Sequence, residues 1–136
     1  MRCDGTYDES VRQCCADAAR SGWPLVQDVS WEGYEEVPRW IYQGYTVLTA
    51  EFIKQLGDVP PTHVLINTGV GGFASSQLGH LWEHFGADRP RFITVEPVLA
   101  DCLIRSGKAG ERTTVPGDLD TIQVLAFLTC IFASQP

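Results

Sequence analysis

Three closely spaced glycines, Gly69, Gly71 and Gly72, are the residues whose spacing most clearly indicates chemistry. They follow a short apolar run, residues 62–66, that predicts a buried strand, and they precede residues 75–85, which can form a helix. A strand, a glycine loop and a helix together present backbone N–H groups and a positive helix N-terminus to a phosphate. An ordinary glycine-rich connection in an α/β domain has the same pattern, so the loop alone leaves both interpretations open.

Two classes of phosphate ligand fit this loop. Residues 69–74 match the pattern G-x-G-x-x-A, and Glu96 ends the next predicted strand, where a dinucleotide-binding protein places its ribose-binding acid. This match to an NAD site is loose, because the strand is not near the start of the chain and Pro97 follows the acid. The second class is a smaller cofactor such as pyridoxal phosphate. Local chemistry does not separate the two classes.

Asp28 is the candidate acid on the N-terminal side of the loop. It follows residues 23–27, a short apolar run that predicts another strand. Polar residues at the carboxyl end of a parallel strand often face a ligand, although aspartate is also common as a turn or helix cap. The next segment, residues 29–36, predicts a loop, and its content of aromatic and acidic residues exceeds what a simple connection needs.

The predicted elements that position these residues alternate between helix and strand. A capping box of Thr6 and Glu9 begins the first helix, which Gly22 ends. A second helix has Pro38 at its first position and ends at Gly57. Its predicted buried face comprises Ile41, Tyr45, Leu48 and Phe52.

The later segments complete the predicted architecture. Residues 91–95 predict a strand, residues 100–106 a short helix, residues 107–116 an irregular segment and residues 118–132 a further helix. Strand and helix alternation predicts an α/β fold, with a parallel sheet and helices on both faces.

The composition excludes several classes of protein. The chain has 136 residues, 44% hydrophobic and 20% charged, which suits one packed domain. Its net charge of −7 argues against a nucleic-acid partner, and no run is apolar enough to span a bilayer or to act as a signal peptide.

The cysteines and histidines do not predict a metal site. Five cysteines without a Cys-x-x-Cys pair indicate a reduced, cytoplasmic protein rather than a disulfide scaffold or a zinc site. His80 and His84 share a helix face but make no zinc-protease motif, so we expect surface histidines and no metal.

Several motifs, in order along the chain, resemble diaminopropionate ammonia-lyase. The most specific is the tryptophan-rich stretch from residue 27 to residue 45, with the sequence QDVSWEGYEEVP followed by WI and QGY. The others are DGTYD at 4–8, PTHV at 61–64, GVG at 69–71, VEP at 95–97, ADC at 100–102, GD at 117–118 and DTI at 120–122. The resemblance covers nearly the whole chain as far as Ile122.

This resemblance implies a pyridoxal-phosphate enzyme of the tryptophan-synthase-β fold type. The family eliminates ammonia from 2,3-diaminopropionate to give pyruvate, and the implied protein is a homodimer acting in amino-acid catabolism. Asp28 matches an active-site aspartate that handles the substrate and its protons. The implied phosphate cradle comprises Gly69, Val70, Gly71, Gly72 and Phe73. Glu96 is implied to be structural or adjacent to the cofactor, and a threonine or serine dehydratase is the related alternative.

Parts of the family pattern are absent from this sequence. The Schiff-base lysine, a second catalytic aspartate and an asparagine-glycine motif precede the matched region in the family. Lys54, expected near a helix end, and Lys108, expected in a loop, do not lie in the lysine's context. We therefore expect residues 1–122 to be a partial, middle portion of the enzyme and residues 123–136 a divergent apolar tail. The isolated chain is expected to be inactive and to expose apolar surface, or to serve as a non-catalytic partner of a full-length homologue.

Overall fold

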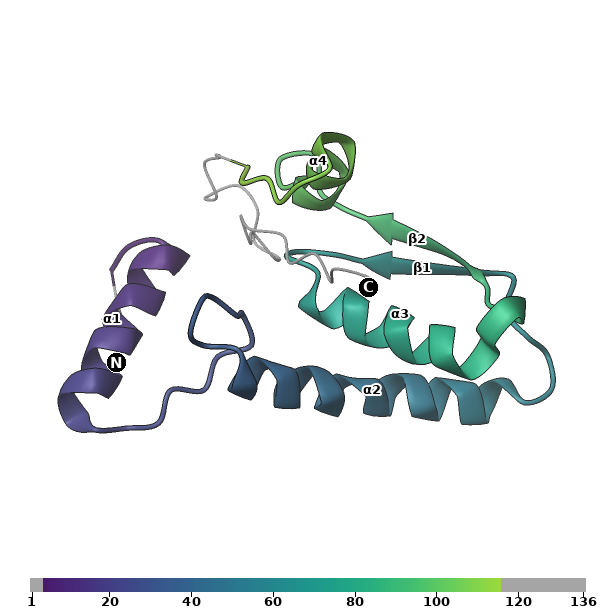
Figure 1. Cartoon of the computed structure of the whole chain (residues 1–136), viewed down its shortest axis with the longest axis horizontal. Coiled ribbons are helices and arrows are strands. Elements are labelled where there is room, and N and C mark those ends of the chain that lie inside the picture. The colour runs from purple at the N-terminus through teal and green to yellow at the C-terminus, as the bar shows by residue number, and fades with distance from the viewer. Residues whose placement is uncertain (1–3, 116–136) are drawn as a thin grey trace.

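The computed structural model describes residues 4–115, shown in colour in Figure 1. The elements are α1 (Tyr7–Ser21), α2 (Glu36–Leu56), β1 (His63–Asn67), α3 (Gly72–Phe85), the short 3-10 helix η1 (Gly86–Asp88), β2 (Arg91–Val95) and α4 (Cys102–Ala109). The helix predicted over 118–132 and the tail predicted over 123–136 lie outside the described residues.

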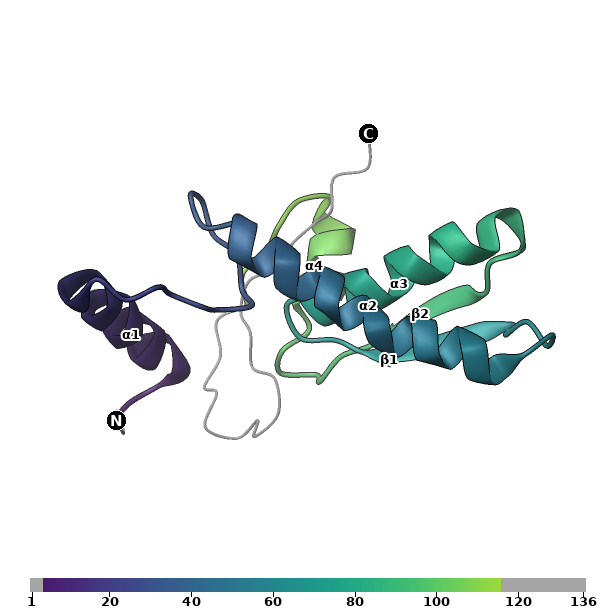
Figure 2. The same ribbon diagram turned by 90° about the horizontal axis from the view of Figure 1, so that it is seen from below.

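β1 and β2 form a parallel pair, with His63 opposite Arg91 and Asn67 opposite Val95. Because α3 connects the two strands, the three elements make a β-α-β unit. α2 packs along α3, and Figures 1 and 2 show the two helices running side by side next to the strands. The predicted α/β class with a parallel sheet is confirmed.

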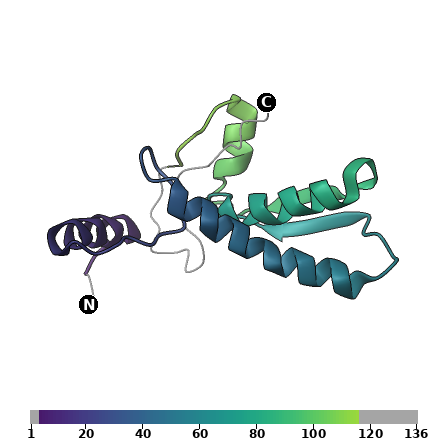
Figure 3. The same cartoon turned by 60° about the horizontal axis from the view of Figure 1, so that its bottom comes forward.

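The predicted helix caps hold for α1. The Thr6 side chain accepts a hydrogen bond from the Glu9 N–H, the Glu9 carboxylate accepts one from the Thr6 N–H, and Gly22 ends the helix in the left-handed region. α1 stands apart from the sheet in Figures 1 and 3, and the Gln27 amide reaches back to it by donating to the Tyr7 hydroxyl over 2.9 Å. In α2 the prediction for Pro38 is wrong by two positions, since the helix begins at Glu36. A first-turn proline is tolerated there because the N–H groups of that turn have no intrahelical acceptor.

The strand predicted over residues 23–27 is wrong. The segment is irregular, and Trp23 and Val26 are exposed. Tyr34 takes the hydrogen bonds that a neighbouring strand would otherwise form, because its hydroxyl donates to the Leu25 carbonyl and accepts from the Gln27 N–H. The following segment is the predicted loop, in which Trp31 and Tyr34 stack with ring centroids 4.3 Å apart.

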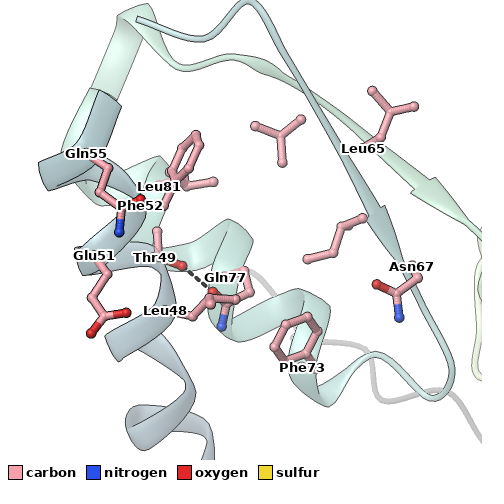
Figure 4. Close-up of a pocket in the computed structure, with 12 residues that line it drawn as sticks. Leu48, Thr49, Glu51, Phe52, Gln55, Leu65, Asn67, Phe73, Gln77 and Leu81 are labelled. Carbon is pink, nitrogen blue, oxygen red and sulfur yellow. Dashed lines mark hydrogen bonds between the residues drawn. The ribbon is translucent and has the colours of Figure 1, made fainter. Parts of the chain in front are cut away.

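The buried face of α2 also differs from the prediction. Leu48 and Phe52 are exposed, whereas Thr49 is 3% exposed and donates a short hydrogen bond to Gln77 of α3. Figure 4 shows this bond beside a cavity of about 470 Å³, which α2, α3 and β1 enclose on three sides. Leu48 and Phe52 line the cavity, so the apolar stripe of α2 faces open space within the described part of the chain. In residues 4–115, no helix is long and apolar enough to cross a membrane.

Candidate anion-binding site at the glycine loop

The glycine loop lies where β1 ends and α3 begins. The Thr68 N–H donates to the Val95 carbonyl over 3.0 Å, which extends the parallel pairing one residue beyond β1. Gly71 then caps α3 with a φ of 101°, a backbone angle that side-chain-bearing residues rarely adopt. The helix begins at Gly72, three residues earlier than predicted, so its N-terminus belongs to the loop itself.

The N-terminus of α3 carries no side-chain cap and no acidic residue in its first turn. By contrast, Thr6 and Glu9 cap α1, and the Glu96 carboxylate accepts hydrogen bonds from two N–H groups of α4. The first-turn N–H groups of a helix lack intrahelical acceptors and carry a partial positive charge. The first turn of α3 therefore suits an anion.

Tyr42 packs against the backbone of this turn. A Cβ atom on Gly72 would lie 2.7 Å from the Tyr42 ring, closer than side chains pack, so glycine is needed at this position. Burial raises the pKa of Tyr42, the Ser30 hydroxyl opposes that rise, and the charge of Asp28 adds to it. Tyr42 therefore stays neutral while it supports the loop.

A pocket of about 250 Å³ lies at the loop. It brings Asp28 together with the predicted phosphate cradle, which comprises Gly69, Val70, Gly71, Gly72 and Phe73. Tyr45, Asn67 and Ala74 also line it. Asp28 lies more than 40 residues before the loop in the chain, so only the fold places it there. Their roles in binding stay predictions.

Tyr45 holds Asp28 at the pocket. Its hydroxyl donates to Asp28 Oδ2 over 3.0 Å, and its ring meets Phe73 edge-on with centroids 5.6 Å apart. Burial raises the pKa of Tyr45, and the hydrogen bond to Asp28 and its negative charge add to the rise. The sequence placed Tyr45 on a buried helix face but gave no sign of this contact.

Gln77 is a residue that sequence reasoning missed. Its side-chain N–H donates to the Tyr45 carbonyl over 2.7 Å, while its oxygen accepts from Thr49. Both side chains are buried, so this polar pair fixes α2 against α3 at the level of Tyr45. In the sequence, Gln77 stands out only as a polar residue on an otherwise apolar helix face. That pattern does not predict which residue it contacts.

Glu96 does not line the pocket. Its two carboxylate oxygens accept from the N–H groups of Leu103 and Ile104, over 2.7 and 2.9 Å, at the start of α4. The adjacent Cys102 is fully buried, and its thiol donates to the Gly69 carbonyl over 3.4 Å. Glu96 thus supports the loop through α4, and the dinucleotide interpretation lacks the free acid that it requires.

The lysines and histidines lie away from the pocket. Lys54 is in the last turn of α2, as predicted, but Lys108 is in the last turn of α4 rather than in a loop. His80 is half-buried and approaches the Thr46 carbonyl at 3.2 Å, so it is not the surface residue expected, whereas His84 is exposed. Among residues 4–115, no group of three metal-ligating side chains could hold an ion.

The fold and this site define an α/β protein with a small pocket, lined by a glycine loop, at the carboxyl end of a parallel strand. No family model matches the chain. It is homologous to curated diaminopropionate ammonia-lyases. The enzyme of Escherichia coli K12 is 43% identical over 129 residues, and that of Salmonella typhimurium is 42% identical over 132. Each match covers 93% of this chain and 32% of the relative, so the chain spans about a third of the length of these relatives.

Solved structures of the Escherichia coli diaminopropionate ammonia-lyase are similar in fold. The complex with D-serine has a TM-score of 0.85 and 39% identity, and covers 94% of this chain and 32% of that one. The complex with an aminoacrylate-PLP azomethine reaction intermediate has a TM-score of 0.82 and 38% identity. The match covers 94% of this chain and 33% of the chain of that complex.

Proposed function

We propose that this chain forms part of the active site of a pyridoxal-phosphate-dependent diaminopropionate ammonia-lyase. The full protein eliminates ammonia from 2,3-diaminopropionate to give pyruvate, as a cytoplasmic homodimer of the tryptophan-synthase-β fold type. The observation that carries the proposal is the pocket in which the glycine loop, the uncapped end of α3 and Asp28 meet. The homologous ammonia-lyases, one of them solved with a PLP-bound intermediate, support the choice of cofactor.

The residues present fit a phosphate group. The loop offers backbone N–H groups without a side chain to obstruct them. Thr68, the residue before the loop, has a buried hydroxyl oxygen with no hydrogen-bond partner among residues 4–115. Thr68 is not among the residues that line the pocket, so the backbone of the loop, and not this hydroxyl, carries the fit to a phosphate.

Each part of the site has a role in this proposal. Residues Gly69 to Phe73 bind and orient the phosphate, and Asp28 receives or returns a proton on the substrate side. Tyr45 fixes the Asp28 carboxylate by the hydrogen bond to Oδ2. The bound cofactor supplies the electron sink for the substrate carbanion. Lys54 and Lys108 do not line the pocket, so we propose that the isolated chain binds the cofactor without turnover.

The test is a titration of the purified chain with pyridoxal phosphate, following quenching of its four tryptophans, with NAD as the parallel ligand. We expect saturation by pyridoxal phosphate alone. Gly71→Asp should abolish it, because the carboxylate would enter the loop and repel the phosphate. Gly79→Asp is the matched control, because Gly79 is an exposed α3 residue with open space around it.

Saturation by NAD alone would move the dinucleotide alternative to first place. Binding of neither ligand would contradict the proposal. Pyruvate released from 2,3-diaminopropionate by the wild-type chain, above the level of Gly71→Asp, would contradict the expected lack of turnover.

A further inference from the structure

Two adjacent free cysteines, Cys14 and Cys15, lie on α1 and take no part in the site at the glycine loop. Both line a second pocket, of about 190 Å³, together with other residues of α1 and residues between 25 and 31. This pocket shares no lining residue with the pocket at the glycine loop. Cys14 is exposed and Cys15 is half-buried, so a small molecule can reach both thiols.

Hydrogen bonds fix the wall of this pocket that faces α1. The Gln27 side-chain N–H donates to the Tyr7 hydroxyl at the start of α1 over 2.9 Å. The Tyr34 hydroxyl donates to the Leu25 carbonyl over 2.9 Å, and the Tyr34 ring stacks on Trp31. The wall is thus tied both to α1 and to the loop that follows it.

The number of sulfur atoms limits which ligand fits. Cysteine sulfur is a soft ligand and prefers soft, thiol-seeking elements. Zinc takes a tetrahedral set of ligands, and residues 4–115 contain no group of three metal-ligating side chains that could hold an ion. The pocket therefore suits a ligand that needs only two sulfur atoms. A trivalent arsenical with one organic group is such a ligand, because arsenic then has two bonds left for sulfur.

The rest of the pocket suits the organic group. Leu25, Val26 and Trp31 supply apolar surface beside the thiols. Val26 is 73% exposed and Trp31 is 39% exposed, so an aromatic group placed against them would remove apolar area from water on both sides.

We propose that Cys14 and Cys15 form a two-thiol site for organic trivalent arsenicals, with the organic group against Leu25, Val26 and Trp31. Consecutive Cα atoms are about 3.8 Å apart, so one arsenic atom can bridge the two side chains. With phenylarsine oxide, the two S–H bonds and the bond from arsenic to oxygen break, and two As–S bonds form. The oxygen leaves as water with both thiol protons, and arsenic stays trivalent, so the step needs no oxidant or reductant.

The experiment titrates the full chain with phenylarsine oxide after reduction with a phosphine. Mass spectrometry of the intact chain should show one phenylarsenic group per chain, and thiol titration should show the loss of two thiols. Cys14→Ser and Cys15→Ser should each weaken binding about a hundredfold, because the second As–S bond forms within one molecule and adds to the first.

Two further variants separate the thiols from the pocket. Ala16→Ser is the matched control, because it places a serine at an exposed position of α1, keeps both thiols and should leave the affinity unchanged. Cys14→Ser combined with Ala16→Cys keeps two adjacent cysteines but moves one of them to a position outside the pocket lining. This variant should bind phenylarsine oxide about tenfold more weakly than wild type, because the phenyl group loses its apolar wall.

Wild-type affinity in either Cys14→Ser or Cys15→Ser, with the fold verified by circular dichroism, would overturn the two-thiol site. Equal affinity of the chain with the moved cysteine would overturn the part assigned to the pocket. Failure of the wild-type chain to bind phenylarsine oxide would overturn the proposal as a whole. None of these outcomes bears on the proposed function, which the titration with pyridoxal phosphate tests separately.

Discussion

Single residues decide how closely the glycine loop can be approached. Gly71 has a backbone angle that favours glycine, and Gly72 lies so close to Tyr42 that even one methyl group would collide with the ring. The two glycines are therefore needed for different reasons, one for conformation and one for space. A glycine pattern in a sequence does not distinguish these reasons.

The effect of Gly72 can be measured by compensation. We expect Gly72→Ala to lower the free energy of unfolding by about 1–3 kcal/mol, because the new Cβ overpacks against Tyr42. Tyr42→Leu in the same chain should recover part of that loss by shortening the opposing side chain. Urea unfolding provides the measurement.

Gly79→Ala is the control for this prediction. A Cβ atom at Gly79 would meet nothing within 4 Å, and alanine is the better helix former. The free energy of unfolding of this variant should therefore rise by about 0.5–1 kcal/mol. Equal stability of the Gly72→Ala and Gly79→Ala variants would show that Tyr42 does not lie against the loop in solution.

The helices α2 and α4 hold the glycine loop in place through residues that do not bind the ligand themselves. α4 lies over the loop because Cys102 reaches the Gly69 carbonyl, and α4 is itself held at its first turn by Glu96. α2 is fixed against α3 by Thr49 and Gln77. The loop is thus held from both sides, and the acid that suggested a ribose contact is used to cap a helix.

The capping role of Glu96 predicts graded losses. Glu96→Ala should lower the free energy of unfolding by about 1–2 kcal/mol, because two N–H groups of α4 lose their acceptor. Glu96→Gln keeps one acceptor oxygen and should lose about half as much. Chemical denaturation measures both.

Glu111→Gln, at an exposed position beyond α4, is the matched control and should change stability by less than about 0.5 kcal/mol. If Glu96→Gln proved as stable as wild type and bound NAD less tightly, the acid would be a ligand contact instead of a cap.

At the scale of the whole molecule, the described part of the chain leaves much apolar surface uncovered. Leu65 of β1 is 68% exposed, and Val47 and Leu48 of α2 are more than half exposed. Leu48 and Leu65 line the cavity of Figure 4, and the sheet has two strands among residues 4–115. The expected exposure of apolar surface is present, and a sheet of this size has limited independent stability.

Substitution of this surface should change association more than folding. Leu48→Lys and Leu65→Lys should lower light scattering and the fluorescence of a bound hydrophobic dye, with unfolding free energies within about 0.5 kcal/mol of wild type. Leu81→Lys makes the same change at a residue 3% exposed and should unfold the chain. If Leu65→Lys lowered the free energy of unfolding as much as Leu81→Lys does, β1 would have to be covered in solution.

The local parts of this protein follow from its sequence. The capping box of α1, the glycine that ends it, the limits of β2 and the glycine loop between strand and helix all depend on residues a few positions apart. Local hydrogen bonding and backbone sterics settle such features, so short motifs were enough. The same motifs, in order, carried the resemblance to diaminopropionate ammonia-lyase.

The tertiary structure decided what depends on partners far apart in the chain. Residues 23–27 have strand-like composition but lack a strand neighbour among the described residues, and Tyr34 takes their hydrogen bonds instead. Thr49 rather than Leu48 is buried, because Gln77 lies opposite it. Glu96 caps α4, and Asp28 reaches the glycine loop beside Tyr45, by contacts that no spacing rule contains. Sequence periodicity predicts which side of a helix or strand is apolar. Which residue from elsewhere in the chain packs against that side is decided by the tertiary structure.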